Sequence, residues 1–118
     1  MIGILLGIAA VIALGIIIAK VVMLTMKWLV NKVKEKLHKR NTTKVAAMDI
    51  NKMIEECENK ISLDEFEKLA DEGATHLLAS VDNEGNVQDV EAIEAENEEM
   101  GVSKYLDKTG EGMIVING

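Results

Sequence analysis

The first nineteen residues of the chain, MIGILLGIAAVIALGIIIA, contain no charged residue, no strongly polar residue and no proline. At about 1.5 Å per residue, a helix over this run measures roughly 28 Å, close to the roughly 30 Å hydrocarbon thickness of a bilayer. Eleven of the residues are Ile, Leu or Val, which favours insertion by about 3–7 kcal/mol. With the apolar residues that follow Lys20, the run predicts a transmembrane helix over residues 1–26.

A cleaved signal peptide is the alternative interpretation of this segment. Signal peptides begin with basic residues, contain an apolar core of about 7–15 residues and end at a cleavage site before a polar mature chain. Here no basic residue precedes the apolar run, the run is longer, and more apolar residues (Val21-Val22-Met23-Leu24) follow it. These features favour a retained membrane anchor.

Charge is divided unevenly along the chain. Residues 1–44 contain eight basic residues and one acidic residue, a net charge of +7, whereas residues 45–118 contain five basic and nineteen acidic residues, a net charge of −14. Because basic residues flank the cytoplasmic side of a membrane span, the N-terminus is expected outside and the C-terminal part in the cytoplasm. The acidic part would repel phosphates, so nucleic acid is not an expected partner.

Residues 27–44 are predicted to form a basic juxtamembrane helix that continues from the span. Its apolar residues recur at 3–4-residue spacing, which is typical of an amphipathic helix. A helix lying on anionic lipid is the favoured interpretation, and a short coiled-coil seam between copies of the chain is the alternative. The residues expected to contact the membrane surface are Lys20, Lys27, Trp28, Lys32, Lys34, Lys36, Lys39 and Arg40.

Two helices are predicted in the first half of the acidic part. Apolar residues at helical spacing indicate a helix over residues 44–59. Ser62-Leu63-Asp64-Glu65 has the pattern of a capping box, in which the Ser and Glu side chains satisfy free backbone N–H groups. A helix is therefore expected to start there and to end at Gly73, a residue suited to a left-handed C-terminal cap.

Short strands are predicted in the remainder of the chain. Residues 75–81 and 87–93 read as a hairpin around the turn Asp82-Asn83-Glu84-Gly85, with a helix over residues 88–100 as the alternative for the second strand. Residues 113–116 form a short apolar run typical of a buried strand. The expected fold is thus a transmembrane helix, a basic amphipathic helix, and a small acidic α+β domain (residues 45–118) with two helices and about three strands.

No catalytic, cofactor-binding or metal-ligating residues are predicted. His38 lies in the basic segment and His76 at an expected strand start, and neither has a second ligand-type residue at a spacing typical of metal sites. The single cysteine, Cys57, is expected to be an unreactive core residue, because neighbouring carboxylates disfavour the thiolate. The sequence therefore favours a protein that is not an enzyme and needs no cofactor.

Two stretches share some features of calcium-binding loops. Residues 80–91 place Asp82, Glu84, Gly85 and Glu91 at positions that an EF-hand uses for ligands and for its glycine bend. The other stretch, residues 54–65, has Ile54 in place of the first ligand. A hairpin turn and a capped helix account for the two stretches more simply, although calcium binding by residues 80–91 is left open.

Gly3, Gly7 and Ala10 form a row of small residues within the apolar run. Such rows let transmembrane helices approach closely, so self-association through these three residues is a candidate interaction.

These features predict a single-pass membrane protein whose acidic cytoplasmic domain is a membrane-tethered binding or scaffold module. The expected partners are anionic lipid, a protein of unknown identity and other copies of the chain. The alternative is a small holin-like, membrane-permeabilising protein that oligomerises through its transmembrane helix. A soluble fragment that captures a partner would favour the first function, and toxicity that depends on the span would favour the second.

Overall fold

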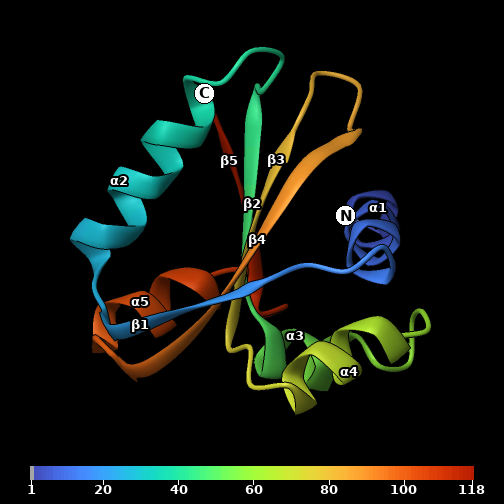
Figure 1. Ribbon diagram of the computed structural model, residues 1–118, viewed down its shortest axis with the longest axis vertical. Coiled ribbons are helices and arrows are strands. Elements are labelled where there is room, and N and C mark those ends of the chain that lie inside the picture. Colours follow the sequence, from blue (N-terminus) through green and yellow to red (C-terminus); the bar gives the residue numbers. More distant parts are fainter. Residues whose placement is uncertain (1) are drawn as a thin grey trace.

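The computed structural model describes residues 2–118, and within them five strands form one mixed sheet and five helices cover its two faces (Figure 1). The strands are β1 (Ile18–Leu24), β2 (Lys44–Asp49), β3 (His76–Val81), β4 (Val87–Glu98) and β5 (Met113–Asn117). The helices are α1 (Ile2–Ala13), α2 (Met26–Leu37), α3 (Ile50–Cys57), α4 (Asp64–Asp71) and α5 (Met100–Leu106).

The strands lie in the order β1-β4-β3-β2-β5. β1 runs parallel to β4, and the three other neighbouring pairs are antiparallel. β4 is twice as long as β3, so its second half extends past the end of β3 and pairs with β1 alone. Because of this extension, the last residue of β4 lies at the end of the sheet where β2 ends and β3 begins.

Helices α1, α3 and α4 lie on one side of the sheet, and α2 and α5 lie on the other (Figure 1). Successive side chains of a β-strand point to opposite faces of the sheet. In β2, Ala46 and Met48 belong to the core beneath α1, α3 and α4, whereas Val45 and Ala47 belong to the core beneath α2 and α5. A sheet buried on both faces explains why β2 is almost continuously apolar.

The N-terminal apolar run does not form one long helix. No helix within residues 2–118 has both the length and the apolar character needed to cross a membrane. The predicted fold class, a transmembrane helix followed by a basic helix and a separate α+β domain, is therefore wrong. The predicted single-pass membrane localisation, with the N-terminus outside and the C-terminus in the cytoplasm, is wrong for the same reason.

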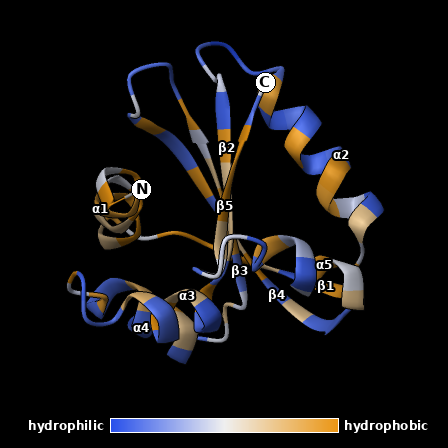
Figure 2. Cartoon of the chain, turned by 180° about the vertical axis from the view of Figure 1, so that it is seen from behind, coloured by the Kyte–Doolittle hydropathy of each residue, from blue (hydrophilic) through white to orange (hydrophobic). Residues whose placement is uncertain are grey.

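Local sequence explains where the apolar run is divided. α1 ends at Ala13, and Gly15 follows with φ +96°, a conformation that a helix cannot continue. The residues that come next are rich in β-branched side chains, which favour strand β1. Thr25 then caps α2, because its side-chain oxygen accepts a hydrogen bond from the Trp28 backbone N–H at 3.1 Å. In Figure 2, α1 is apolar on most of its surface, whereas α2 alternates between apolar and polar residues.

The helix predicted over residues 44–59 is correct only in its second half. Residues 44–49 form the interior strand β2, with which β3 pairs on one side and β5 on the other. Asp49 ends the strand and caps α3 by accepting a hydrogen bond from the Lys52 N–H at 3.2 Å. A short apolar run does not distinguish a buried strand from a helix by periodicity alone, which is why the strand was missed.

The other strand and helix predictions for the C-terminal part are confirmed, but the capping box predicted for the second helix is not. The hairpin is formed by β3 and β4 and the last strand by β5, so the alternative helix over residues 88–100 is wrong. α4 forms near the expected place, but its N-cap residue is Leu63 and no side chain caps it, so the predicted Ser62 capping box does not form. Gly73 follows α4 with φ +110°, as expected for a left-handed position.

Candidate metal centre

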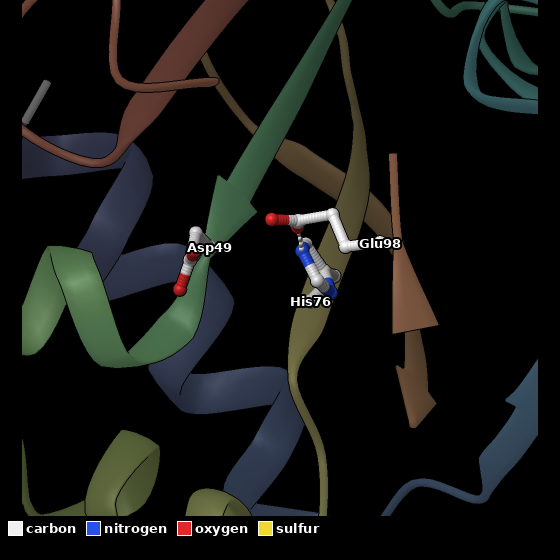
Figure 3. A group of neighbouring side chains, drawn as sticks. All are labelled: Asp49, His76 and Glu98. Atoms are coloured by element: carbon white, nitrogen blue, oxygen red, sulfur yellow. Dashed lines mark hydrogen bonds and ion pairs between the residues drawn. The ribbon is translucent and has the colours of Figure 1, made fainter. Parts of the chain in front are cut away.

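Three ligand-type side chains meet at one end of the sheet, where β2 ends, β3 begins and β4 ends. They are Asp49, His76 and Glu98, and one ligand atom from each lies within 4.8 Å of the other two. Figure 3 shows Glu98 reaching back over the His76 ring toward Asp49. His76 is only 6% exposed, whereas Asp49 and Glu98 are partly exposed, so the cluster lies at the surface with its imidazole buried.

The sheet itself positions the three residues. Asp49 and His76 are directly opposite each other in the antiparallel pair of β2 and β3, which places their Cβ atoms within about 5.5 Å. The backbone of Asp49 is held by its N–H bond to the carbonyl of Gly112 at 2.9 Å. Glu98 is the last residue of the extended half of β4, and its Cα pairs with Leu24 of β1.

The His76 ring is fixed at both nitrogens. Nδ1 lies 2.7 Å from the hydroxyl oxygen of Thr75, and Nε2 lies 2.5 Å from a carboxylate oxygen of Glu98. The Thr75 oxygen also accepts a hydrogen bond from the Ala95 N–H at 2.9 Å and can donate its only hydrogen to the carbonyl of Ile93 at 3.3 Å. With the hydroxyl hydrogen directed at Ile93, the Nδ1–H of His76 donates to Thr75 and the Nε2 lone pair is available to a metal ion. With that hydrogen directed at Nδ1 instead, the Nε2–H of His76 donates to Glu98.

A proton joins Nε2 of His76 to Glu98, because 2.5 Å is a hydrogen-bond distance and is shorter than the spacing of two ligand atoms on one metal ion. In the metal-free protein the Nε2–H of His76 donates to Glu98. A divalent metal ion satisfies the same atoms and requires the Nδ1–H contact with Thr75, because ligating histidines donate their other ring N–H to a neighbouring oxygen. Thr75 thus fits the role of the residue that orients a metal-binding imidazole.

The spacing needs only small adjustments to fit a metal ion. Two ligand atoms that each lie about 2.1 Å from one ion are about 3.0–3.4 Å apart in tetrahedral or octahedral geometry. The His76–Glu98 distance would therefore have to lengthen, and Asp49 would have to move closer. Asp49 uses one carboxylate oxygen as the cap of α3, which leaves the other free for a ligand bond.

The lysines predicted to face a membrane are instead divided between two environments. Lys36 is buried and lies 3.5 Å from Asp89 and 3.3 Å from Glu91 of β4, while Lys32 pairs with Glu91 and Lys39 with Asp89. Trp28 is partly buried, with the Lys32 ammonium 5.7 Å from its ring centroid. The remaining predicted contact residues are exposed: Lys20, Lys27, Lys34 and Arg40.

The ion pairs beneath α2 give the folded protein a defined pH dependence. Burial raises the pKa of Asp89, but the Ser80 hydroxyl, the hydrogen bond from Lys39 and the charges of Lys36 and Lys39 together outweigh burial and hold that pKa below its usual range. A carboxyl whose pKa is lower in the folded state stabilises the fold above its unfolded pKa of about 3.9, and this stability is lost as the pH falls through the folded pKa.

We therefore expect the urea midpoint of the metal-free protein to fall on acidification below about pH 4. Asp89→Asn should lower the midpoint at neutral pH and make the acid-induced loss smaller. Chemical denaturation at a series of pH values measures both effects. Equal acid dependence in the variant and the wild type would show that Asp89 does not carry the effect.

The row of small residues in the apolar run lies on α1 within the domain. Gly7 packs against β4, since a Cβ atom added to it would lie 2.7 Å from a methyl group of Val87. Gly3 has no atom within 4 Å of such a Cβ, and Ala10 is exposed. Close packing of α1 on the sheet thus accounts for Gly7, while self-association through the row stays a prediction.

The other residues considered from the sequence do not join the cluster. Residues 80–91 form the hairpin, and the Asp82 carboxylate accepts hydrogen bonds from the backbone N–H groups of Glu84 and Asn86 rather than lying in an EF-hand loop. His38 is exposed at the end of α2. Cys57 is buried, and burial raises the pKa of its thiol, which agrees with the predicted unreactive role.

Sequence reasoning missed the cluster because its members are far apart in the chain. His76 was expected to have no second ligand-type residue at a spacing typical of metal sites, yet the antiparallel register places Asp49 opposite it. The one local feature that could have indicated the site is a histidine at the first position of a buried strand, with Thr75 directly before it. It becomes informative only once the register of β2 and β3 is known.

Comparison with known proteins gives no match: no family model fits the sequence, and no curated protein or solved structure is significantly similar to it.

Proposed function

We propose that this chain is a binding module that holds one divalent transition-metal ion at Asp49, His76 and Glu98. The observation that carries the proposal is the convergence of a buried, oriented imidazole with two carboxylates. Both functions predicted from the sequence required a transmembrane helix. A role as a binding module does not require such a helix, so the proposal keeps that role.

The ligand set indicates the class of metal. One imidazole nitrogen with two carboxylate oxygens suits zinc, cobalt, manganese or ferrous iron better than the soft ions that prefer thiolates. Magnesium and calcium bind mainly oxygen ligands, so a histidine at the centre disfavours them. Zinc and cobalt are therefore the probes with the strongest expected binding.

A structural role for the ion is supported better than catalysis. The cavity that His76 borders has a volume of only about 10 Å³. A larger groove of about 740 Å³ lies between α2 and the segment before β1, and none of the three ligand residues lines it. An ion at the cluster would link the ends of β2, β3 and β4, and would stabilise the fold in proportion to its occupancy.

Zinc and cobalt titration of tag-free protein tests the proposal. We expect binding of one ion per chain and a rise in melting temperature with metal concentration. Calorimetric titration gives the stoichiometry and the affinity.

Glu98→Gln should weaken binding at least 10-fold, since it removes a charged ligand. Glu96→Gln is the matched control, because Glu96 is exposed on the same strand and lies outside the cluster. Absence of stoichiometric binding, or equal affinity in the two variants, would contradict the proposed site.

A further inference from the structure

β1 forms one edge of the sheet. It pairs with β4 on one side, and within residues 2–118 no strand lies on its other side. Val22 and Met23 of this strand are 70% and 48% exposed. Because an edge strand presents free backbone N–H and C=O groups, an apolar edge is a template for pairing with another strand.

Exposed apolar side chains are concentrated next to this edge. Leu14 and Ile17, in the segment that leads into β1, are 88% and 89% exposed. α1, which precedes that segment, adds exposed Ile2 and Leu6. Isolated apolar residues are ordinary at a protein surface, but this many from one short segment mark an interaction surface.

Charge favours a second copy of the chain as the partner. The whole chain has a net charge of −7, so two copies repel each other over most of their surfaces. Residues 2–24 contain one charged side chain, Lys20, and no acidic residue. β1 therefore adds no acidic group to an interface between two copies, and Lys20 lies beside Glu94 of β4 in the same sheet.

The sequence of β1 is also complementary to itself in an antiparallel register. With a two-fold axis at Val21, Ile18 lies opposite Leu24, Ala19 opposite Met23, and Lys20 opposite Val22 of the other copy. Two of these three pairs are apolar on both sides, and in the third Lys20 faces Val22. The two lysines are therefore not directly opposed, an arrangement that would be destabilising. Two-fold symmetry of this kind is the commonest arrangement in homodimers.

We propose that the chain forms a homodimer by antiparallel pairing of β1 with β1 of a second copy, which joins the two sheets into one. A stable interface buries roughly 800 Å² on each partner. A single pair of seven-residue strands is small against that area, so Leu14 and Ile17 contribute to the interface as well.

The register predicts opposite results for two substitutions at one position. Val22→Lys places an ammonium opposite Lys20 twice in each dimer and should weaken dimerisation about 2–30-fold, given about 0.2–1 kcal/mol for each like-charged pair. Val22→Glu places a carboxylate opposite Lys20 and should preserve the dimer. Val30→Lys is the matched control, because Val30 is exposed on α2, away from the β1 edge.

Analytical ultracentrifugation of all four proteins over a concentration series tests the proposal. The expected result is a dimer for the wild type, Val22→Glu and Val30→Lys, with a weaker dimer for Val22→Lys. A monomeric wild type at every concentration would overturn the proposal. Equal weakening by Val22→Lys and Val22→Glu would overturn the register, and unchanged dimerisation in Val22→Lys would overturn the assignment of the interface to β1.

Discussion

Replacing His76 with alanine is expected to abolish zinc and cobalt binding. His76 supplies the only nitrogen ligand of the proposed centre, and its loss leaves two carboxylates that do not retain the ion on their own. Loss of an outer-shell partner already costs a metal site about 10–100-fold in affinity, so loss of this ligand should cost more. The measurement is calorimetric titration, together with the visible absorption of the cobalt-loaded protein.

His38→Ala is the matched control, because the chain has two histidines and His38 is exposed. It should bind metal as the wild type does. Because His76 is buried, misfolding of His76→Ala would also abolish binding, so a second variant is needed. Thr75→Val keeps the imidazole but removes the oxygen that contacts Nδ1. It should weaken binding about 10–100-fold. Unchanged metal affinity in His76→Ala would contradict the proposed centre.

Replacing Gly112 with alanine is expected to be the most damaging of the glycine substitutions. Gly112 has φ +71°, a conformation that costs other residues about 1–3 kcal/mol. A Cβ atom there would lie 2.5 Å from the backbone nitrogen of Met53 and 2.8 Å from the carbonyl carbon of Lys52, so helix α3 would have to move. Overpacking of this kind adds about 1–3 kcal/mol, and the sum is a large part of the stability of a small domain.

Gly85→Ala provides the control for the Gly112 prediction. Gly85 has φ +88° in the hairpin turn, but a Cβ atom there would meet nothing within 4 Å. Its substitution should cost only the backbone strain of about 1–2 kcal/mol. Urea denaturation of both variants gives the comparison, and equal losses of stability would show that the contact of Gly112 with α3 is not as close as described.

Gly112 also connects stability to the metal centre. Its carbonyl accepts the hydrogen bond from the backbone N–H of Asp49, so a shift of Gly112 moves a proposed ligand. Any Gly112→Ala protein that still folds should therefore bind zinc more weakly than Gly85→Ala does.

Local signals in the sequence were enough to predict some elements of the fold. The hairpin was predictable because Asp82 and Gly85 favour a tight turn between two runs of strand-forming residues. The position of α4 and the last strand β5 followed from equally local patterns. Their prediction needed no information from a distant part of the chain, although β5 is held in the sheet by pairing with β2.

The N-terminal segment was not predictable in the same way. A run without polar residues has no periodicity, so nothing in its hydrophobic pattern separates one long helix from a helix followed by an edge strand. The break depends on Gly15 and on the pairing of β1 with β4, more than seventy residues later in the sequence. Only the tertiary structure shows that pairing.

The metal centre could not be predicted from the sequence for a related reason. Its three residues are separated by 27 and 22 positions, and none belongs to a short motif. Asp49 and His76 meet because β2 and β3 are in one particular register, and Glu98 joins them because β4 continues past β3. A shift of the register by one residue would separate the ligands.

The most direct test of the metal centre is X-ray diffraction from crystals of tag-free, zinc-loaded protein, with data collected on both sides of the zinc absorption edge. We predict one anomalous peak between Asp49, His76 and Glu98, about 2.0–2.2 Å from Nε2 of His76 and from one oxygen of each carboxylate. An empty cluster in zinc-loaded crystals, or zinc bound only at other residues, would contradict the account.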